Sequence, residues 1–158
     1  MKKEVPAQSS NYILPEKDFN KRIDKIFDQI YSEKPEYWEN GLNRDLFTGL
    51  GDKIILLSDK DKDMGFIGFQ KYRRAKNNKL GTAVSVGILP EYRGKGLARE
   101  VLTQIIPEVI KPQDGDIIWS CHKDNKPSQK LCEWLMKQKN SIPNNFILQL
   151  DSKAREKL

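Results

Sequence analysis

The chain has few of the features that mark secreted or membrane-bound proteins. Its two cysteines, Cys121 and Cys132, are too few for a disulfide framework in 158 residues. No run of apolar residues approaches the length of a membrane-spanning helix. The basic residues 1–3 are followed by a polar segment and not by the apolar stretch of a secretory leader. We therefore expect a cytoplasmic protein, with neither membrane association nor a metal site.

The composition suits a well-solvated globular protein. Hydrophobic residues make up 37% of the chain and charged residues 32%, and the formal net charge is +6. A chain of this length is typical of one domain, so we expect residues 1–158 to form a single unit with flexible ends at 1–11 and 152–158. The positive charge favours an anionic ligand or partner, which a polyphosphate cofactor satisfies as easily as nucleic acid.

Periodicity predicts helices near the start of the chain, then three consecutive antiparallel strands, and a helix on each side of the strand that follows them. An apolar stripe at three- and four-residue spacing predicts a helix over 16–32. A second helix is expected to start at Pro35, and Pro107 is expected to kink or end a helix that begins at Leu97. The remaining predicted elements are strands at 12–14, 53–58, 64–72, 80–89, 116–121 and 146–150, and a helix that begins near Pro127. The strand at 116–121 should run parallel to that at 80–89, across a right-handed crossover.

The most informative stretch covers residues 84–110. It consists of an alternating strand, the turn Arg93-Gly94-Lys95-Gly96, and an amphipathic helix. The first N–H groups of a helix have no helical partner and its dipole favours negative charge there, so this turn is a candidate anion site. Lys95 and Arg99 add positive charge at the same end. The alternative is that Gly-x-Gly is only a tight turn.

The turn lacks the glycine patterns of the two commonest nucleotide-binding loops. It matches neither G-x-G-x-x-G nor G-x-x-x-x-G-K-[ST]. Arg93, Gly96 and Ala98 do match the Q/R-x-x-G-x-G/A signature, with a strand before it and a helix behind it. In this the segment resembles the acyl-CoA-binding motif of the GNAT (Gcn5-related N-acetyltransferase) superfamily.

The resemblance implies a fold, a reaction and a set of contacts. The fold is an α/β (α+β) one, with a mostly antiparallel sheet, a parallel splayed strand pair and about four helices. The reaction is acetyl transfer from acetyl-CoA to a primary amine, either a small molecule or a protein lysine or N-terminus. The implied pyrophosphate contacts are Arg93, Gly94, Lys95, Gly96, Leu97, Ala98 and Arg99. The implied pantetheine contacts are Val86, Gly87 and Ile88.

Gly87 stands alone among apolar residues of a predicted strand. Such a glycine indicates a bulge or a close backbone approach. The resemblance implies a bulge that parts this strand from its parallel neighbour and admits pantetheine. The alternative is a residue that lies under a large side chain.

A second partial resemblance follows the strand at 116–121. Asn125 and Ser128 fit the family's Asn-x-x-Ser pattern, which implies contacts with the cofactor near the reaction centre. The same two residue types are also common at a helix start for backbone reasons alone, so capping is the competing interpretation.

The expected catalytic acid and base are not matched. The tyrosine that protonates the CoA thiolate in the family is replaced by Cys132, which either supplies that proton or is an inert small hydrophobe. Polar strand positions that often carry a carboxylate hold Ser85 and Ser120. His122, the only histidine, is either a base or a solvated turn residue. The candidate catalytic residues are therefore Cys132, His122 and Ser120.

Three functions are compatible with these patterns. The first is an N-acetyltransferase, acting as a monomer or a homodimer on acetyl-CoA and an amine acceptor. The second is a catalytically weak or inactive domain that binds CoA as a sensor or interaction module. The third is nucleic-acid binding by the basic residues Arg73, Arg74, Lys76 and Lys79. Because Tyr72 is the only aromatic residue beside them, no stacking platform is apparent and we do not expect nucleic acid as a partner.

Overall fold

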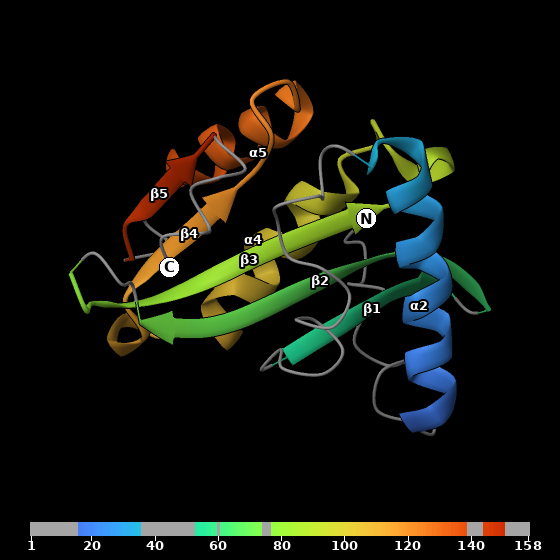
Figure 1. The fold of residues 1–158 in the computed structure, drawn as a ribbon, viewed down its shortest axis with the longest axis horizontal. Helices are drawn as coiled ribbons and strands as arrows, with labels where there is room; N and C mark the ends of the chain where they lie inside the picture. Colours follow the sequence, from blue (N-terminus) through green and yellow to red (C-terminus); the bar gives the residue numbers. More distant parts are fainter. Residues whose placement is uncertain (1–15, 36–52, 60, 74–76, 139–143, 151–158) are drawn as a thin grey trace.

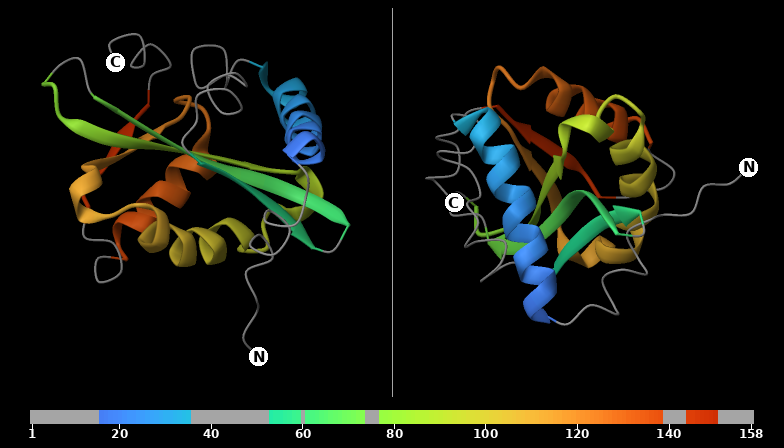
Figure 2. Two further views of the ribbon diagram at one scale, coloured as in Figure 1. Left: turned by 90° about the horizontal axis from the view of Figure 1, so that it is seen from below. Right: turned by 90° about the vertical axis from the view of Figure 1, so that its right-hand side faces the viewer.

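The computed structural model describes residues 16–35, 53–59, 61–73, 77–138 and 144–150 (Figure 1). Seen edge-on, the sheet forms a middle layer with helices on both of its faces (Figure 2). The elements are α2 (Glu16–Glu33), β1 (Lys53–Asp59), β2 (Lys62–Arg73), β3 (Leu80–Ile88), η2 (Pro90–Tyr92), α4 (Leu97–Val109), η3 (Pro112–Asp114), β4 (Asp116–Ser120), α5 (Lys126–Met136) and β5 (Phe146–Gln149).

The strands form one mixed sheet in the order β1-β2-β3-β4-β5. The pairs β1–β2 and β2–β3 are antiparallel, whereas β3–β4 and β4–β5 are parallel. The predicted parallel pairing of the strands at 80–89 and 116–121 is therefore confirmed. The sheet is antiparallel through its first three strands and parallel from there on, because α4 and α5 each return the chain to the starting edge of the next strand.

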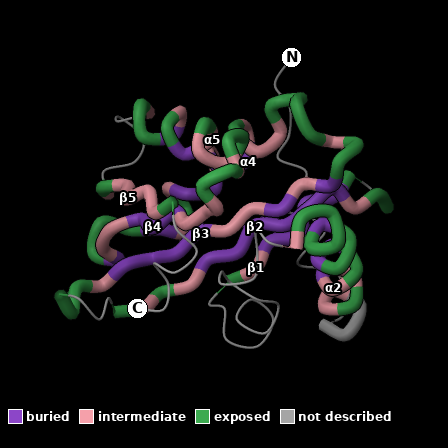
Figure 3. Tube along the Cα trace, turned by 45° about the horizontal axis from the view of Figure 1, so that its top comes forward, coloured by how far each residue is buried: buried purple, intermediate pink, exposed green. Residues whose placement is uncertain are grey.

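Two apolar clusters hold the layers together. The predicted stripe on α2 is buried against β1 and β2, where Ile23, Ile26 and Ile30 meet Phe66. On the opposite face α4 and α5 cover β3, β4 and β5, with Val101, Leu102, Ile105 and Ile106 of α4 in the cluster. Figure 3 shows the buried trace running through the middle strands and the exposed residues on the outer sides of the helices.

Pro107 does not end its helix. The helix continues to Val109, and the N–H of Ile110 donates to the carbonyl of Ile106 at 2.8 Å. Proline removes one helical donor, but Ile106 and Ile110 are both buried, and their packing holds the last turn in place. The predicted strand at 12–14 lies outside the described residues, as does the predicted second helix beyond Pro35, so three α-helices are described where about four were expected.

The bulge predicted at Gly87 is wrong, and the alternative is correct. The β2–β3 register runs without a break from Gly65↔Ile88 to Arg73↔Leu80. A Cβ on Gly87 would lie 2.5 Å from Cε1 of Phe66 and 2.8 Å from Cδ1 of Ile30, so only glycine fits under these side chains.

The parting of the parallel strands is nevertheless present. The β3–β4 pairing ends at Val84↔Trp119, while β3 runs on to Ile88 beside β2 and β4 runs on to Ser120 beside β5 (Figure 1). Beyond Val84 each strand follows its own outer neighbour. The separation therefore needs no bulge.

Candidate functional site

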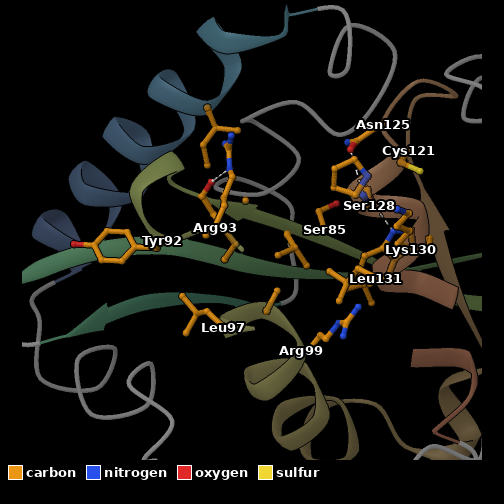
Figure 4. Close-up of a pocket in the computed structure, with 18 of the residues that line it drawn as sticks. Ser85, Tyr92, Arg93, Leu97, Arg99, Cys121, Asn125, Ser128, Lys130 and Leu131 are labelled. Carbon is orange, nitrogen blue, oxygen red and sulfur yellow. Dashed lines mark hydrogen bonds between the residues drawn. The ribbon is translucent and has the colours of Figure 1, made fainter. Parts of the chain in front are cut away.

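A cavity of about 790 Å³ opens where β3 and β4 part (Figure 4). Its volume falls within the usual range of small-molecule and cofactor sites. Its walls come from the end of α2, the last residues of β3 and β4, the turn before α4, and the first turns of α4 and α5. Most of the predicted cofactor contacts line it, namely Val86, Gly87, Ile88, Arg93, Gly94, Gly96, Leu97, Ala98, Arg99, Asn125 and Ser128.

The turn before α4 lines this cavity at the point where the helix begins. Gly94 and Gly96 have φ values of 74° and 78°, the left-handed region that favours glycine. A Cβ on either residue would meet no atom within 4 Å, so the space above the turn is open. No side chain caps α4 at Gly96, and its first backbone hydrogen bond runs from Glu100 to Gly96. The amides of residues 97–99 therefore remain available to an anion.

Basic side chains from α4 and α5 also line the cavity. The guanidinium of Arg99 lies over the ring of Trp134, with Cζ 5.1 Å from its centroid. Lys130, on α5, also lines the cavity, and Figure 4 shows both side chains there. Lys95 instead lies 5.9 Å from the ring centroid of Tyr92 and is not on the wall. Positive charge from two helices therefore adds to the dipole of α4 at one end of the cavity.

The guanidinium of Arg93 is held in place by hydrogen bonds to other residues of the protein. Its Nε donates to the carbonyl of Ile88 at 2.7 Å, and its two terminal nitrogens donate to the carboxylate of Glu33 at 3.0 and 2.7 Å (Figure 4). The motif arginine thus connects the end of β3 and the end of α2. Sequence reasoning did not single out Glu33, because its partner lies 60 residues away and no local pattern reveals the pair.

The backbone of β3 offers polar groups beyond the point where the strands part. The N–H of Leu89 donates to Met64 on the β2 side. In an antiparallel ladder these groups alternate between the two sides, so those of Val86 and Ile88 face away from β2. The bond from Arg93 to the Ile88 carbonyl agrees with this direction. An amide-bearing ligand in the cavity can therefore pair with Val86 and Ile88 as a strand would.

Asn125 and Ser128 both line the cavity and both serve the local fold. Asn125 is the N-cap of α5, and its side chain accepts a hydrogen bond from the Ser128 N–H at 3.3 Å. The Ser128 Oγ accepts one from Nε1 of Trp119 at 2.9 Å. The capping interpretation is thus confirmed for Asn125, and a cofactor contact by either residue stays a prediction.

The three candidate catalytic residues are not brought together. Ser120 lines the cavity and its Oγ donates to Oε1 of Gln149 at 3.2 Å. Nδ1 of His122 accepts from the Asp124 N–H at 3.1 Å in the turn after β4, away from the cavity wall. Cys132 is fully buried in the core under α5, and this burial raises the pKa of its thiol to about 12. These surroundings suit the alternative in which Cys132 is an inert small hydrophobic residue.

Cys121 is a further residue on the wall that the sequence did not point to. It follows the last residue of β4 and is partly buried. Burial raises the pKa of its thiol, against a smaller opposing effect of a hydrogen bond with Ser128. The sequence could have indicated this position, because Cys121 is the last residue of the strand predicted at 116–121, and the end of that strand faces the cavity.

The basic segment considered for nucleic acid is only partly described. Nη1 of Arg73 donates to the Asn78 carbonyl at 3.1 Å, which links the two sides of the hairpin, whereas Arg74 and Lys76 lie outside the described residues. Among the helices that the structure describes, none is both long and apolar enough to cross a membrane.

Comparison with known proteins gives one family and several folds of the same kind. The family model described as "Acetyltransferase (GNAT) domain" matches residues 14–135. A possible acetyltransferase from Clostridium difficile 630 superposes with a TM-score of 0.51 at 20% identity, over 73% of this chain and 84% of that one. A ribosomal-protein-alanine N-acetyltransferase from Brucella melitensis gives 0.53 at 18% identity, over 77% and 80%. No curated protein matches the sequence. At these identities the structural likeness shows the fold alone.

Proposed function

The chain belongs to the GNAT acetyltransferase family, and on that premise we propose that it transfers the acetyl group of acetyl-CoA to a primary amine. One observation carries the proposal. A single cavity joins the uncapped start of α4 to the gap between β3 and β4. A ligand with an anionic end and a long amide-bearing arm matches that shape and that distribution of polar groups.

Two regions of the cavity would bind two different parts of the coenzyme. The diphosphate would take the N–H groups of the turn and of the first residues of α4, with Arg99 and Lys130 supplying charge. The pantetheine amides would pair with Val86 and Ile88, where β4 no longer does. The open space over Gly94 and Gly96 supports this placement, because any larger residue would occupy it.

The chemistry is aminolysis of a thioester. The nitrogen of a neutral amine forms a bond to the carbonyl carbon, the bond from that carbon to sulfur breaks, and the proton lost by the amine ends on the CoA thiol. Holding the two reactants in contact lowers the barrier by several kcal/mol, about 7–11 in the best-oriented cases. A backbone N–H of Val86 or Ile88 would polarise the thioester carbonyl. Ser120, at the end of β4, would lie beside the reacting groups.

A catalytically weak CoA-binding domain is the competing proposal, and one observation favours it. Glu33 is the only carboxylate among the described residues of the wall, and Arg93 holds both of its oxygens. Cys132 and His122 are off that wall. No unpaired carboxylate and no imidazole among the described residues of the wall is thus placed to take the proton from an ammonium group, so a transferase of this kind would use the neutral fraction of its acceptor, with water carrying the proton.

Two measurements test the proposal in sequence. Calorimetric titration with acetyl-CoA should show one site per chain, and absence of heat at high micromolar ligand would end the proposal in both forms. Release of the CoA thiol should then be followed across a panel of primary amines, including small polyamines, amino acids and peptides with a Lys side chain or a bare N-terminus. Turnover well above hydrolysis with any amine rejects the inactive form, and binding with no turnover across the panel supports it.

A further inference from the structure

We propose that Glu33 is a positioning residue that couples the end of α2 to the turn before α4 through Arg93. This inference rests on the proposed function, because it concerns how the cavity receives CoA. The bridge consists of three hydrogen bonds that run from Arg93 to the Ile88 carbonyl and to the two carboxylate oxygens of Glu33. It adds a polar connection between α2, β3 and the turn before α4, at the cavity edge of the apolar packing of Ile30 against the β3 side of the sheet.

The location of Glu33 is unfavourable without its partner. It is the last residue of α2, where the helix dipole is negative and a carboxylate is destabilising. The last turn of α2 contains no basic residue. Arg93 supplies the missing positive charge from a different part of the chain, in a two-pronged arrangement that fixes the plane of the guanidinium. The pair therefore fixes where the end of α2 sits relative to the turn.

Arg93 also retains capacity for an anion. Its three hydrogen bonds use three of the five N–H donors of a guanidinium. Its side chain is 45% exposed and lines the cavity beside Gly94 and Gly96. Glu33 thus holds the guanidinium at the edge of the anion site with two N–H donors left for a diphosphate oxygen. A diphosphate that engages them would tighten the bridge and, with it, the last turn of α2.

The consequence concerns the wall of the cavity that the end of α2 provides. Ile30 and Glu33 of α2, with Lys34 directly after it, line the cavity, so a firmer end of α2 is a firmer cavity wall. CoA binding at the turn should therefore reduce the motion of α2 before any acceptor arrives. The coupling is reciprocal, because anything that fixes the end of α2 should also favour the coenzyme.

The experiment compares Glu33→Gln with Glu91→Gln. Glu91 lies in η2 close to the same turn, is exposed and is not on the cavity wall. Both variants remove one negative charge near a polyanion, so general electrostatics alone would strengthen CoA binding in both. The bridge makes the opposite prediction for Glu33→Gln only. Its Kd for CoA should rise about threefold to fivefold, the scale of a well-oriented partly exposed ion pair, while Glu91→Gln should bind as tightly as the wild type or slightly more tightly.

Hydrogen exchange provides a second readout that needs no acceptor. With saturating CoA, peptides over residues 93–100 should be protected in all three proteins. Peptides over residues 28–34 should be protected in the wild type and in Glu91→Gln, and not in Glu33→Gln. Melting temperatures measured without ligand show whether Glu33→Gln is simply less stable, and Glu33→Asp, which keeps the charge, should recover part of both effects.

The outcomes separate cleanly. If the wild type fails to bind CoA, the proposed function fails and the bridge with it. If the wild type binds but Glu33→Gln binds equally or more tightly, or still protects residues 28–34, Arg93 does not act through Glu33 and the inference is overturned while the proposed function stands.

Discussion

Glycines at three positions of the cavity are required for two different reasons. Gly94 and Gly96 adopt positive φ in open space, so the requirement there is backbone conformation. Gly87 has an ordinary strand conformation, and the requirement there is the absence of a side chain under Phe66 and Ile30. The same residue type therefore predicts different consequences of substitution within one site.

Gly87→Ala should destabilise the fold. The added methyl would overlap the ring of Phe66 and the end of Ile30 in a closely packed cluster, and such overpacking costs about 1–3 kcal/mol. Thermal or urea unfolding measures this cost. Gly94→Ala is the matched control, since its new Cβ meets no atom within 4 Å and only its positive φ opposes it, at about 1 kcal/mol. Equal stability of Gly87→Ala and the wild type would show that β3 lies farther from α2 than described.

Gly96→Val should separate ligand binding from folding. A β-branched residue at a φ of 78° is strained by about 1–2 kcal/mol, which folding can tolerate, but the side chain would occupy the space over the turn. We expect CoA affinity to fall at least tenfold, measured by calorimetry with the far-ultraviolet circular dichroism spectrum as the control. Unchanged affinity would remove the turn from the coenzyme site.

The two cysteines should differ in their response to coenzyme. Burial raises the pKa of Cys132 to about 12 and also raises that of Cys121, so both should react slowly with a thiol reagent at pH 8. Cys121 lines the cavity and Cys132 lies in the core, so Cys121 should react first and saturating CoA should slow it. Mass spectrometry of the labelled peptides follows each residue. Protection of Cys132 alone would contradict the described placement.

Because the folded state holds Cys132 as a neutral thiol, the sign of its pH dependence is fixed. A thiol in the unfolded chain ionises near pH 9, and the folded one near 12. The stability that this group contributes is therefore complete below pH 9 and is lost as the pH rises from there toward 12.

At the scale of elements, helices and strands were predictable because their signals are local. The apolar stripe of α2, the alternation of β3 and the glycine turn before α4 each lie within one stretch of sequence. The contacts that cross between elements were not predictable. Phe66 over Gly87 explains why a glycine resembled a bulge, and the packing around Ile106 and Ile110 explains why Pro107 did not end α4. Local rules name the elements, and their packing decides such exceptions.

The start of α5 offers a test of its two roles. Asn125→Ala removes the N-cap and should cost about 1 kcal/mol of stability, while Asn125→Asp keeps an accepting oxygen and should cost little. Thermal unfolding measures this. If Asn125 also donates its amide N–H to the coenzyme, Asn125→Asp should weaken CoA binding even though the cap remains. Equal affinity of Asn125→Asp and the wild type would limit this residue to capping.

At the scale of the whole molecule, charge is the property of the structure that follows most directly from the sequence. The net charge of +6 was evident from composition, and the structure places Arg99, Lys130 and the start of α4 at one end of the cavity. What composition does not reveal is that the single described carboxylate of the wall, on Glu33, is neutralised by Arg93. That ion pair joins residues distant in sequence, so no local sequence pattern predicts it.

Salt should therefore weaken coenzyme binding more than it weakens binding of the uncharged arm. Screening between 0.05 and 0.5 M NaCl shortens the Debye length from above 10 Å to below 5 Å or so. We expect the Kd for CoA to rise several-fold across this range and that for pantetheine, which lacks the phosphates, to change little. Fluorescence of the Trp119 and Trp134 indoles beside the cavity, or calorimetry, reports both. A flat salt dependence for CoA would contradict an electrostatic site at the turn.

The gap in the sheet has a further consequence for the protein without its ligand. Beyond Val84 and Trp119, β3 and β4 lack the backbone hydrogen bonds that would normally join neighbouring strands. The coenzyme would supply these hydrogen bonds in place of a strand. The melting temperature should then rise with coenzyme concentration, as mass action requires of any ligand that binds only the folded form. On the proposed function, the coenzyme-free protein should therefore be cleaved by a protease more readily than the complex.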